Sequence, residues 1–171
     1  MSPTSRVYSW SSTYGIGDNY PAYHISYEDC QSFLIALNIK LSSQLGSGEQ
    51  FRFPTEAEWE FAAKGGTKSK GFTYSGSNTI GDFAWYKENS NDTTHPVKTK
   101  AANELGLYDM SGNVREWCCD WYGSYSGAKT DEYRVIRGGS WDDYATGCRV
   151  TDRGMGCPDL HYNDIGFRLA L

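Results

Sequence analysis

The chain has 171 residues, enough to bury a core without the help of a disulfide or a metal. Its net charge of −5 and its predicted pI of about 5.2 argue against non-specific binding to nucleic acid. No run of about 18 apolar residues predicts a membrane span, and residues 1–15 lack the apolar centre of a signal peptide. We therefore expect a protein of the cytoplasm, or one assembled into a phage particle or a cell-surface particle.

The composition favours short strands and structured loops over a helix bundle. Aromatic residues make up 15% of the chain, and 19 glycines accompany them. The cysteines match no zinc-binding spacing, and their odd number leaves at least one thiol unpaired, so we expect reduced, structural thiols. They are Cys30, Cys118, Cys119, Cys148 and Cys157.

Residues 1–25 are polar and aromatic and predict an extended lead-in over residues 1–20, followed by one short strand at residues 22–25. A helix begins next, because Ser26 is a good N-cap and acidic residues occupy the first turn. Apolar residues then repeat at helical spacing until glycines at positions 46 and 48 end the helix. This stripe consists of Cys30, Phe33, Leu34, Leu37 and Leu41.

A short strand at residues 51–53 and a second helix follow. Pro54 closes the strand, and Thr55-Glu56-Ala57-Glu58 is a capping box, in which Thr55 and Glu58 each bind the other's backbone amide. The helix extends over residues 56–64 and ends at two glycines. The cap and the helix dipole explain the glutamates of this helix better than a catalytic carboxylate cluster does.

Residues 67–100 are a long polar connection, in which His95 has no catalytic partner nearby in the sequence. Residues 105–117 are denser, because Asp109 and Glu116 bracket a turn whose carbonyls can face the same point. Calcium prefers oxygen ligands of this kind, although any tight turn needs the same residue types. Residues 117–122 then predict a buried strand.

Residues 134–171 form two strand-like ends around an insert. Residues 134–137 and 165–171 alternate apolar with polar or small residues, as half-buried strands do. Between them, residues 142–164 show neither the strand period nor the helix period. A rigid frame around an irregular insert is typical of a surface that presents side chains. Because no repeat or linker interrupts the chain, we expect one domain over residues 1–171.

Four segments occur in the order that one known family shows. They are FRFPTEAEWEFAAKGG at residues 51–66, NELGLYDMSGNVREW at 103–117, RVIRGGSW at 134–141 and NDIGFRLAL at 163–171. Over residues 20–171 the chain resembles the formylglycine-generating enzyme and sulfatase-modifying-factor family. The resemblance implies an α+β fold, a variant of the C-type lectin fold with two helices, short antiparallel strands and much irregular loop. Most of the family's N-terminal stretch is missing, which implies a compact version.

The resemblance also implies a structural calcium site. The family's ligands map onto the side chains of Asp109 and Glu116 and onto the carbonyls of Gly112 and Val114. The tryptophan of the usual motif is Arg115 in this chain, a change that leaves these ligands in place. We therefore expect that calcium is the metal to test.

Copper and catalysis are not expected. In the family, oxidase activity resides in two cysteines, and alignment on the motifs places them at Ala145 and Val150. Copper(I) needs thiolate ligands at fixed geometry, and Cys148 and Cys157 lie off the required positions. Two alternatives stay open: a sulfatase-modifying-factor-like oxidase, and a catalytically inactive structural relative.

The C-terminal region is similar to the variable proteins of diversity-generating retroelements, in which a reverse transcriptase rewrites adenine-containing codons. The residues that such proteins keep are present at 138–141, 148–150, 153, 158–159 and 165–168. Apart from Met155, nearly all residue types between them are reached by replacing adenines in an AAC codon. The positions that such a system varies are Asp142, Asp143, Tyr144, Thr146, Gly147, Asp152, Gly154, Met155, Gly156, Cys157, Leu160, His161, Tyr162, Asn163 and Asp164.

This second resemblance implies a non-catalytic ligand-binding protein of receptor or adhesion type, from a bacterium or a phage. Its partner would be a protein or a surface ligand, not nucleic acid. Tyrosine and histidine at such positions give contact area and a hydrogen bond at little entropic cost. A flat site of this size binds weakly alone, so we expect multivalent display on a cell or phage particle.

Overall fold

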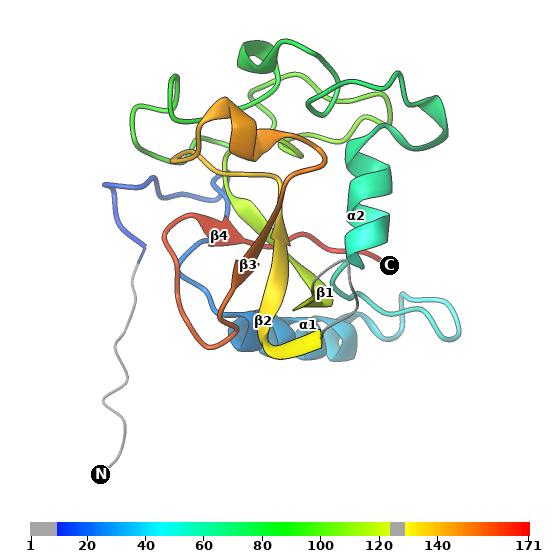
Figure 1. Ribbon diagram of the computed structural model, residues 1–171. Helices are drawn as coiled ribbons and strands as arrows, with labels where there is room; N and C mark the ends of the chain where they lie inside the picture. Colours follow the sequence, from blue (N-terminus) through cyan, green and yellow to red (C-terminus); the bar gives the residue numbers. More distant parts are fainter. Residues whose placement is uncertain (1–9, 124–128) are drawn as a thin grey trace.

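The computed structural model describes residues 10–123 and 129–171. Two helices and a four-stranded sheet are joined by long irregular segments (Figure 1). The helices are α1, Tyr27–Leu41, and α2, Glu56–Ala63. The strands are β1, Arg115–Gly123, β2, Lys129–Arg137, β3, Arg153–Gly156, and β4, Ile165–Gly166. None of the described helices is long and apolar enough to cross a membrane.

Both helices begin at the capping boxes that the sequence predicts. Ser26 accepts a hydrogen bond from the amide of Asp29 and Thr55 accepts one from the amide of Glu58, and in each case the acidic side chain binds the backbone of the cap in return. Residue Leu41 ends α1, before the glycines that were expected to end it. Phe33 of the predicted apolar stripe is 50% exposed, since it lies on the flank of α1.

The strands are arranged in the order β3-β2-β1-β4. Pairing is antiparallel between β1 and β2 and between β2 and β3, as expected, but β4 is parallel to β1. The chain reaches this parallel position because residues 157–164 cross from the β3 edge past the start of α1 to the other edge of the sheet. Along this path Tyr27 donates its amide to the carbonyl of Pro158.

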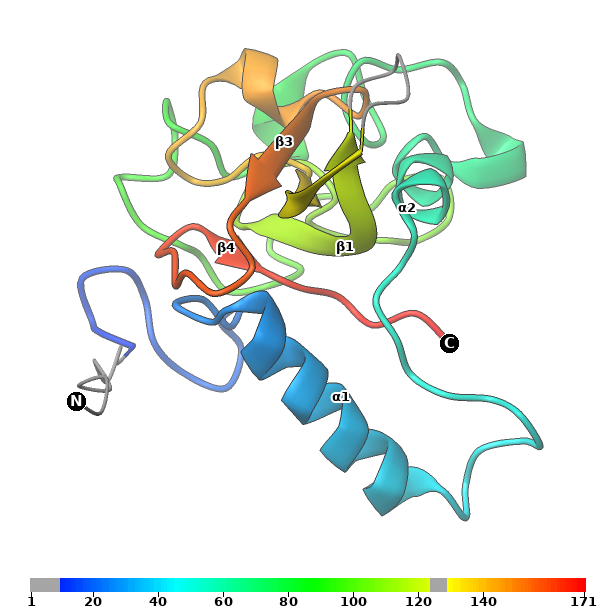
Figure 2. The same cartoon turned by 60° about the horizontal axis from the view of Figure 1, so that its bottom comes forward.

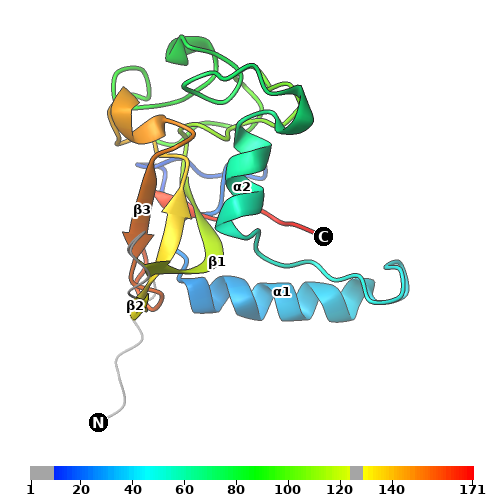
Figure 3. The ribbon, with the colours of Figure 1, turned by 45° about the vertical axis from the view of Figure 1, so that its right-hand side comes forward.

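Alternate side chains of the sheet pack against different helices. Trp117 and Ile136 point to α1, where Tyr27 stacks on Phe53 with ring centroids 4.4 Å apart. Their neighbours in the two strands, including Val135, point to α2. Figures 2 and 3 show α1 running across one end of the sheet while α2 stands along its side. The loops of residues 66–114 gather at the end of the molecule opposite α1 (Figure 1).

Several predicted strands are shorter than expected or absent. Residues 22–25 are irregular, and residues 51–53 contribute a single bridge, from Arg52 to Ala170. The predicted strand at residues 165–171 is limited to β4 and that bridge. Conversely, the insert contains a strand that was not predicted, β3. It lacks the apolar alternation of a half-buried strand because its inward-facing positions are Gly154 and Gly156.

Candidate ligand-binding face

The frame of residues 134–171 is anchored to α2 by ion pairs of two arginines with glutamates of that helix. The side chain of Arg137 is fully buried and donates to the carboxylate of Glu60 at 2.5 Å and to the carbonyl of Val150 at 2.8 Å. Arg153 donates two hydrogen bonds to Glu56, at 2.8 and 2.6 Å. The start of β3 and the end of β2 are therefore held in place independently of the exposed part of the insert.

Asp143 fixes the first turn of the insert. Its carboxylate accepts hydrogen bonds from the amide and the hydroxyl of Ser140, both at 2.8 Å, and from Arg115 at 2.5 Å. Its carbonyl accepts the amide of Lys87. The structure thus gives this predicted variable position a supporting role inside the loop.

Two further predicted positions are packed too tightly to carry a side chain. A Cβ atom on Gly156 would lie 2.4 Å from the indole of Trp117, and one on Gly154 would lie 2.9 Å from Ile136. Real Cβ atoms do not approach a ring carbon so closely, so glycine is required at Gly156 unless the core shifts. These contacts narrow the surface that side-chain variation can reach.

The remaining residues divide into an exposed group and an anchored group. Tyr144, Met155 and Leu160 are exposed by 66%, 53% and 48%. With the exposed Asp142 and Thr146, they form what we call the binding face. By contrast, residues 161–164 are half-buried, and the carbonyls of Tyr162 and Asn163 accept hydrogen bonds from His24 and Trp141.

His161 joins this anchored group through the start of α1. Its imidazole Nε2 lies 2.8 Å from the carboxylate of Asp29, the capping residue of that helix. Gly147 ends a turn in which its own amide donates to the carbonyl of Tyr144. The thiol of Cys157 donates to the carboxylate of Asp159 at 3.0 Å. All these residues stay candidate positions, but they reach a ligand less readily than the binding face does.

A cavity of about 320 Å³ lies on the sheet beside the binding face. All four strands contribute to it, with Arg115 from β1, Ile136 from β2, Met155 from β3 and Ile165 from β4. We call it the sheet cavity; it is also lined by Asp152, Arg153, Gly154, Tyr162 and Asp164. Its one signal in the sequence is Arg115, which stands where the usual motif has tryptophan.

The electrostatics of the sheet cavity depend on half-buried carboxylates. Burial raises the pKa of Asp152 and of Asp164, and the nearby guanidinium of Arg115 opposes this rise. Arg115 lies 4.0 Å from Asp152, a longer approach than its 2.5 Å contact with Asp143. The cavity is therefore acidic and incompletely neutralised.

The residues proposed for calcium do not fit that ion as they are arranged. The buried carboxylate of Glu116 accepts hydrogen bonds from Trp59 at 2.6 Å and from Arg168 at 2.6 and 2.7 Å, so a guanidinium already neutralises it. Asp109 accepts the amide of Lys98 through one oxygen, while its other oxygen is buried without a partner in the described residues. Burial raises the pKa of Asp109.

The four predicted ligands are brought together in part. Asp109, Val114 and Glu116 line one cavity of about 400 Å³, whereas Gly112 lies against the carbonyl of Trp85 and donates its amide to Gly138. The described part of the chain holds no group of three or more His, Cys, Asp or Glu side chains that could bind a metal ion. Calcium stays a prediction for experiment.

The positions of the family's cysteines are structural here. Ala145 begins a short 3₁₀ helix, Ala145–Cys148, and Val150 is 2% exposed. All five thiols of the chain are free. Burial raises the pKa of Cys148 to about 12, and the hydrogen bond to Asp159 raises that of Cys157. Both thiols are therefore protonated at neutral pH.

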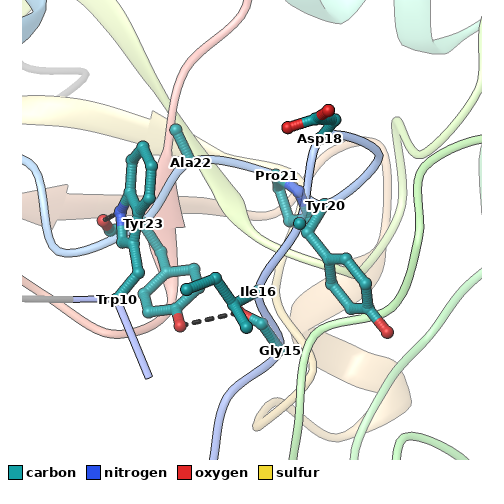
Figure 4. Close-up of a pocket in the computed structure, with 9 residues that line it drawn as sticks. Trp10, Gly15, Ile16, Asp18, Tyr20, Pro21, Ala22 and Tyr23 are labelled. Atoms are coloured by element: carbon teal, nitrogen blue, oxygen red, sulfur yellow. Dashed lines mark hydrogen bonds between the residues drawn. The ribbon is translucent and has the colours of Figure 1, made fainter. Parts of the chain in front are cut away.

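The lead-in forms a second cavity that the sequence did not predict. This cavity of about 440 Å³ is lined by residues 15–18 and 20–23 and by Trp10 (Figure 4). The indole of Trp10 donates to the carbonyl of Tyr23 at 2.6 Å, and the Tyr23 hydroxyl donates to Gly15 at 2.7 Å. These bonds satisfy the polar atoms of both aromatic side chains and fold the lead-in back on itself.

Comparison with known proteins supplies relatives over almost the whole chain. Residues 3–171 match the model of the sulfatase-modifying factor enzyme 1-like domain. The formylglycine-generating enzyme of Streptomyces coelicolor is 32% identical over 89% of this chain and 52% of its own length. The inactive C-alpha-formylglycine-generating enzyme 2 of Bos taurus is 31% identical over 98% of this chain and 57% of its own length. The chain thus spans about half the length of these curated relatives.

Among solved structures, variable protein 1 of Treponema denticola superposes with a TM-score of 0.78 at 32% identity. The match covers 98% of this chain and 76% of that protein. Since likeness at this level extends to the whole architecture, the C-type lectin-like α+β fold that the motifs imply is confirmed.

Proposed function

The chain belongs to the sulfatase-modifying factor enzyme 1-like family, and from this premise we propose that it is a non-catalytic ligand-binding protein of receptor or adhesion type. Its C-terminal region displays variable side chains on a fixed lectin-like scaffold, as the variable proteins of diversity-generating retroelements do. The partner is a protein or a surface ligand, bound through multivalent display on a cell or phage particle.

One observation carries this proposal: within residues 134–171, the residues that anchor the region to the core are not the residues that are exposed. Arg137 and Arg153 bind α2, whereas Tyr144, Met155 and Leu160 contribute little to the core and project from it. Exposed side chains on a fixed support can change without loss of the fold. They also need little ordering when a ligand binds. The likeness to variable protein 1 of Treponema denticola supports the same function.

The chemistry of the chain supports binding over oxidation. The relatives include both enzymes and inactive members, so membership alone does not decide. Ala145 and Val150 occupy the positions of the thiolates that the oxidase chemistry needs, and neither side chain can bind copper. The competing function, a sulfatase-modifying oxidase, is tested by oxygen consumption with copper and a sulfatase-derived cysteine peptide. Turnover comparable to that of an active family member would overturn the proposal.

The decisive test of the proposed function is genomic. We expect a near-copy of the coding segment for residues 134–171 beside a reverse transcriptase gene, differing from it only at adenines. The packing sharpens this expectation, because adenine-templated changes should reach the codons of Tyr144 and Leu160 and spare those of Gly154 and Gly156. If no template copy exists, the chain is an inactive structural relative and the proposed variation is wrong.

A further inference from the structure

The sheet cavity combines an apolar floor with walls of mixed character. Ile136 and Ile165 are 5% and 2% exposed and lie at its base, while Tyr162 lies beside it. The side chain of Met155 points to the other face of the sheet, because Met155 pairs in register with Val135, which packs against α2. Apolar side chains and an aromatic ring are suitable contacts for the methylene groups of a long side chain. A volume of about 320 Å³ accommodates one side chain of a partner rather than a whole folded element.

The charges around this cavity do not cancel. The guanidinium of Arg153 is directed to Glu56, and that of Arg115 is held by Asp143 at 2.5 Å. Asp152 and Asp164 then remain, and the closest ion-pair contact of either among the described residues is the 4.0 Å approach of Arg115 to Asp152. Two half-buried carboxylates beside an apolar floor attract a cation and repel an anion.

We propose that the sheet cavity accepts one cationic side chain of the partner, the amine or guanidinium end of a lysine or arginine, with Asp152 and Asp164 as its acceptors. This inference rests on the proposed function, since it assigns a chemical class of ligand to the same face. The methylene stem of the cationic side chain packs on Tyr162 and on the apolar floor. Asp152 and Asp164 are themselves predicted variable positions, so this ligand class is a property of this chain and changes where they vary.

Isoleucine methyl groups make this inference measurable without knowledge of the partner. In chain labelled with ¹³C at the isoleucine δ1 methyl groups, Ile136 and Ile165 report on the cavity, and Ile80, which is buried in a different cluster, serves as an internal control. The probes are n-butylguanidinium, n-butylammonium, the neutral isostere n-butylurea and the anion pentanoate. We expect the Ile136 and Ile165 signals to move saturably with the two cations, about ten-fold more weakly with n-butylurea, and not with pentanoate. The Ile80 signal should not respond.

Charge-removing variants assign the response to the carboxylates. Asp152→Asn and Asp164→Asn should each weaken n-butylguanidinium binding several-fold. Asp82→Asn, which removes an exposed carboxylate distant in sequence from the cavity, should leave it unchanged. Circular dichroism checks that each variant is folded. Two cavity variants are used so that the result does not depend on a single variant that fails to fold. Equal binding of n-butylurea, or cation binding that survives in both folded cavity variants, overturns the inference.

Failure of this inference is distinguishable from failure of the proposed function. If the gene has a template copy but the protein does not bind the cations, the proposed function stands and the cationic ligand is wrong. If the protein binds the cations but the gene has no template copy, the ligand class stands and the retroelement is wrong.

Discussion

Two arginine-centred clusters of charge lie on opposite faces of the same sheet. Arg137 pairs in register with Glu116, the residue after Arg115, so the two arginines point to different faces. On the face packed against α2, the carboxylates of Glu56 and Glu60 are both paired, with Arg137 and Arg153 from the sheet and with Lys64 from the end of α2. On the other face, Arg115 meets the carboxylates of residues 143, 152 and 164 beside an open cavity.

The difference teaches how one stretch of chain can be both fixed and available. The α2-side cluster encloses the fully buried Arg137 and leaves neither of its carboxylates unpaired, so its ion pairs hold β2 and β3 whatever the exposed residues are. The cavity-side cluster is unbalanced and open, so part of its attraction is left for a partner. A charge pattern that is satisfied internally supports the fold, and one that is not supports recognition.

The largest expected effect comes from breaking the enclosed cluster. Arg137→Ala should lower the free energy of unfolding by about 3–5 kcal/mol, because it removes a fully buried guanidinium that donates to Glu60 and to two backbone carbonyls. Arg115→Ala, the matched change in the open cluster, should cost only about 1–2 kcal/mol. Urea denaturation followed by circular dichroism measures both. Equal losses would mean that the open cluster supports the fold as strongly as the enclosed one.

The next effect separates two neighbours in β3. Gly156→Ala should destabilise the chain by about 1–3 kcal/mol, since the new methyl group would lie 2.4 Å from Trp117. Met155→Ala removes an exposed side chain and should change stability by about 0.5 kcal/mol or less. Thermal unfolding of both variants checks the contrast. A neutral Gly156→Ala would show that the support tolerates variation after all.

These neighbours also show what could be read from the sequence. The capping boxes predicted the start of both helices because the pattern is local. It consists of a short polar residue followed three positions later by an acidic one. The β3 strand was missed because its alternation is carried by glycines, whose absent side chains leave room for Trp117 and Ile136. Strand periodicity is visible only when the buried positions hold apolar residues.

The candidate site was predictable in outline and not in detail. The frame and the insert followed from motifs, but the division of the insert into exposed and anchored residues depends on contacts across the chain. Asp143 meets Arg115 and His161 meets Asp29, pairs that are 28 and 132 positions apart in the sequence. The sheet cavity is lined by residues from all four strands, so it could not be predicted without the order and register of those strands.

A smaller effect concerns pH and has opposite signs in two places. Burial holds the folded pKa of Asp164 above the unfolded value of 3.8, so its charge opposes folding at neutral pH. Asp164→Asn should therefore unfold at a slightly higher temperature than the parent chain. The gap should close as the pH falls through the folded pKa, where the parent carboxyl takes up its proton. Melting curves across this pH range measure the gap, and one that widens on acidification contradicts the assignment.

Glu58 in the α2 capping box provides the contrasting case. Hydrogen bonds from Arg52 and Thr55 lower its pKa from 4.5 to about 2. Its contribution is fully present above the unfolded value of 4.5 and is lost as the pH falls towards about 2. Glu58→Gln should thus melt below the parent chain at neutral pH, with a difference that shrinks on acidification. The exposure of this pair to solvent keeps the difference small.

The smallest expected effect is that of calcium on the melting temperature. It tests whether the carboxylate of Glu116, on the α2 face, is already neutralised by its protein partners. Glu116 lies on this face, where Arg168 and Trp59 supply three hydrogen bonds to its carboxylate. A divalent cation there would have to bind beside a buried guanidinium, so millimolar calcium should leave the melting temperature of the chain where EDTA leaves it. Calcium that binds the folded state should raise that temperature by mass action. Such a rise would restore Asp109, with its unpartnered oxygen, as a metal ligand and would require Arg168 to move away from Glu116.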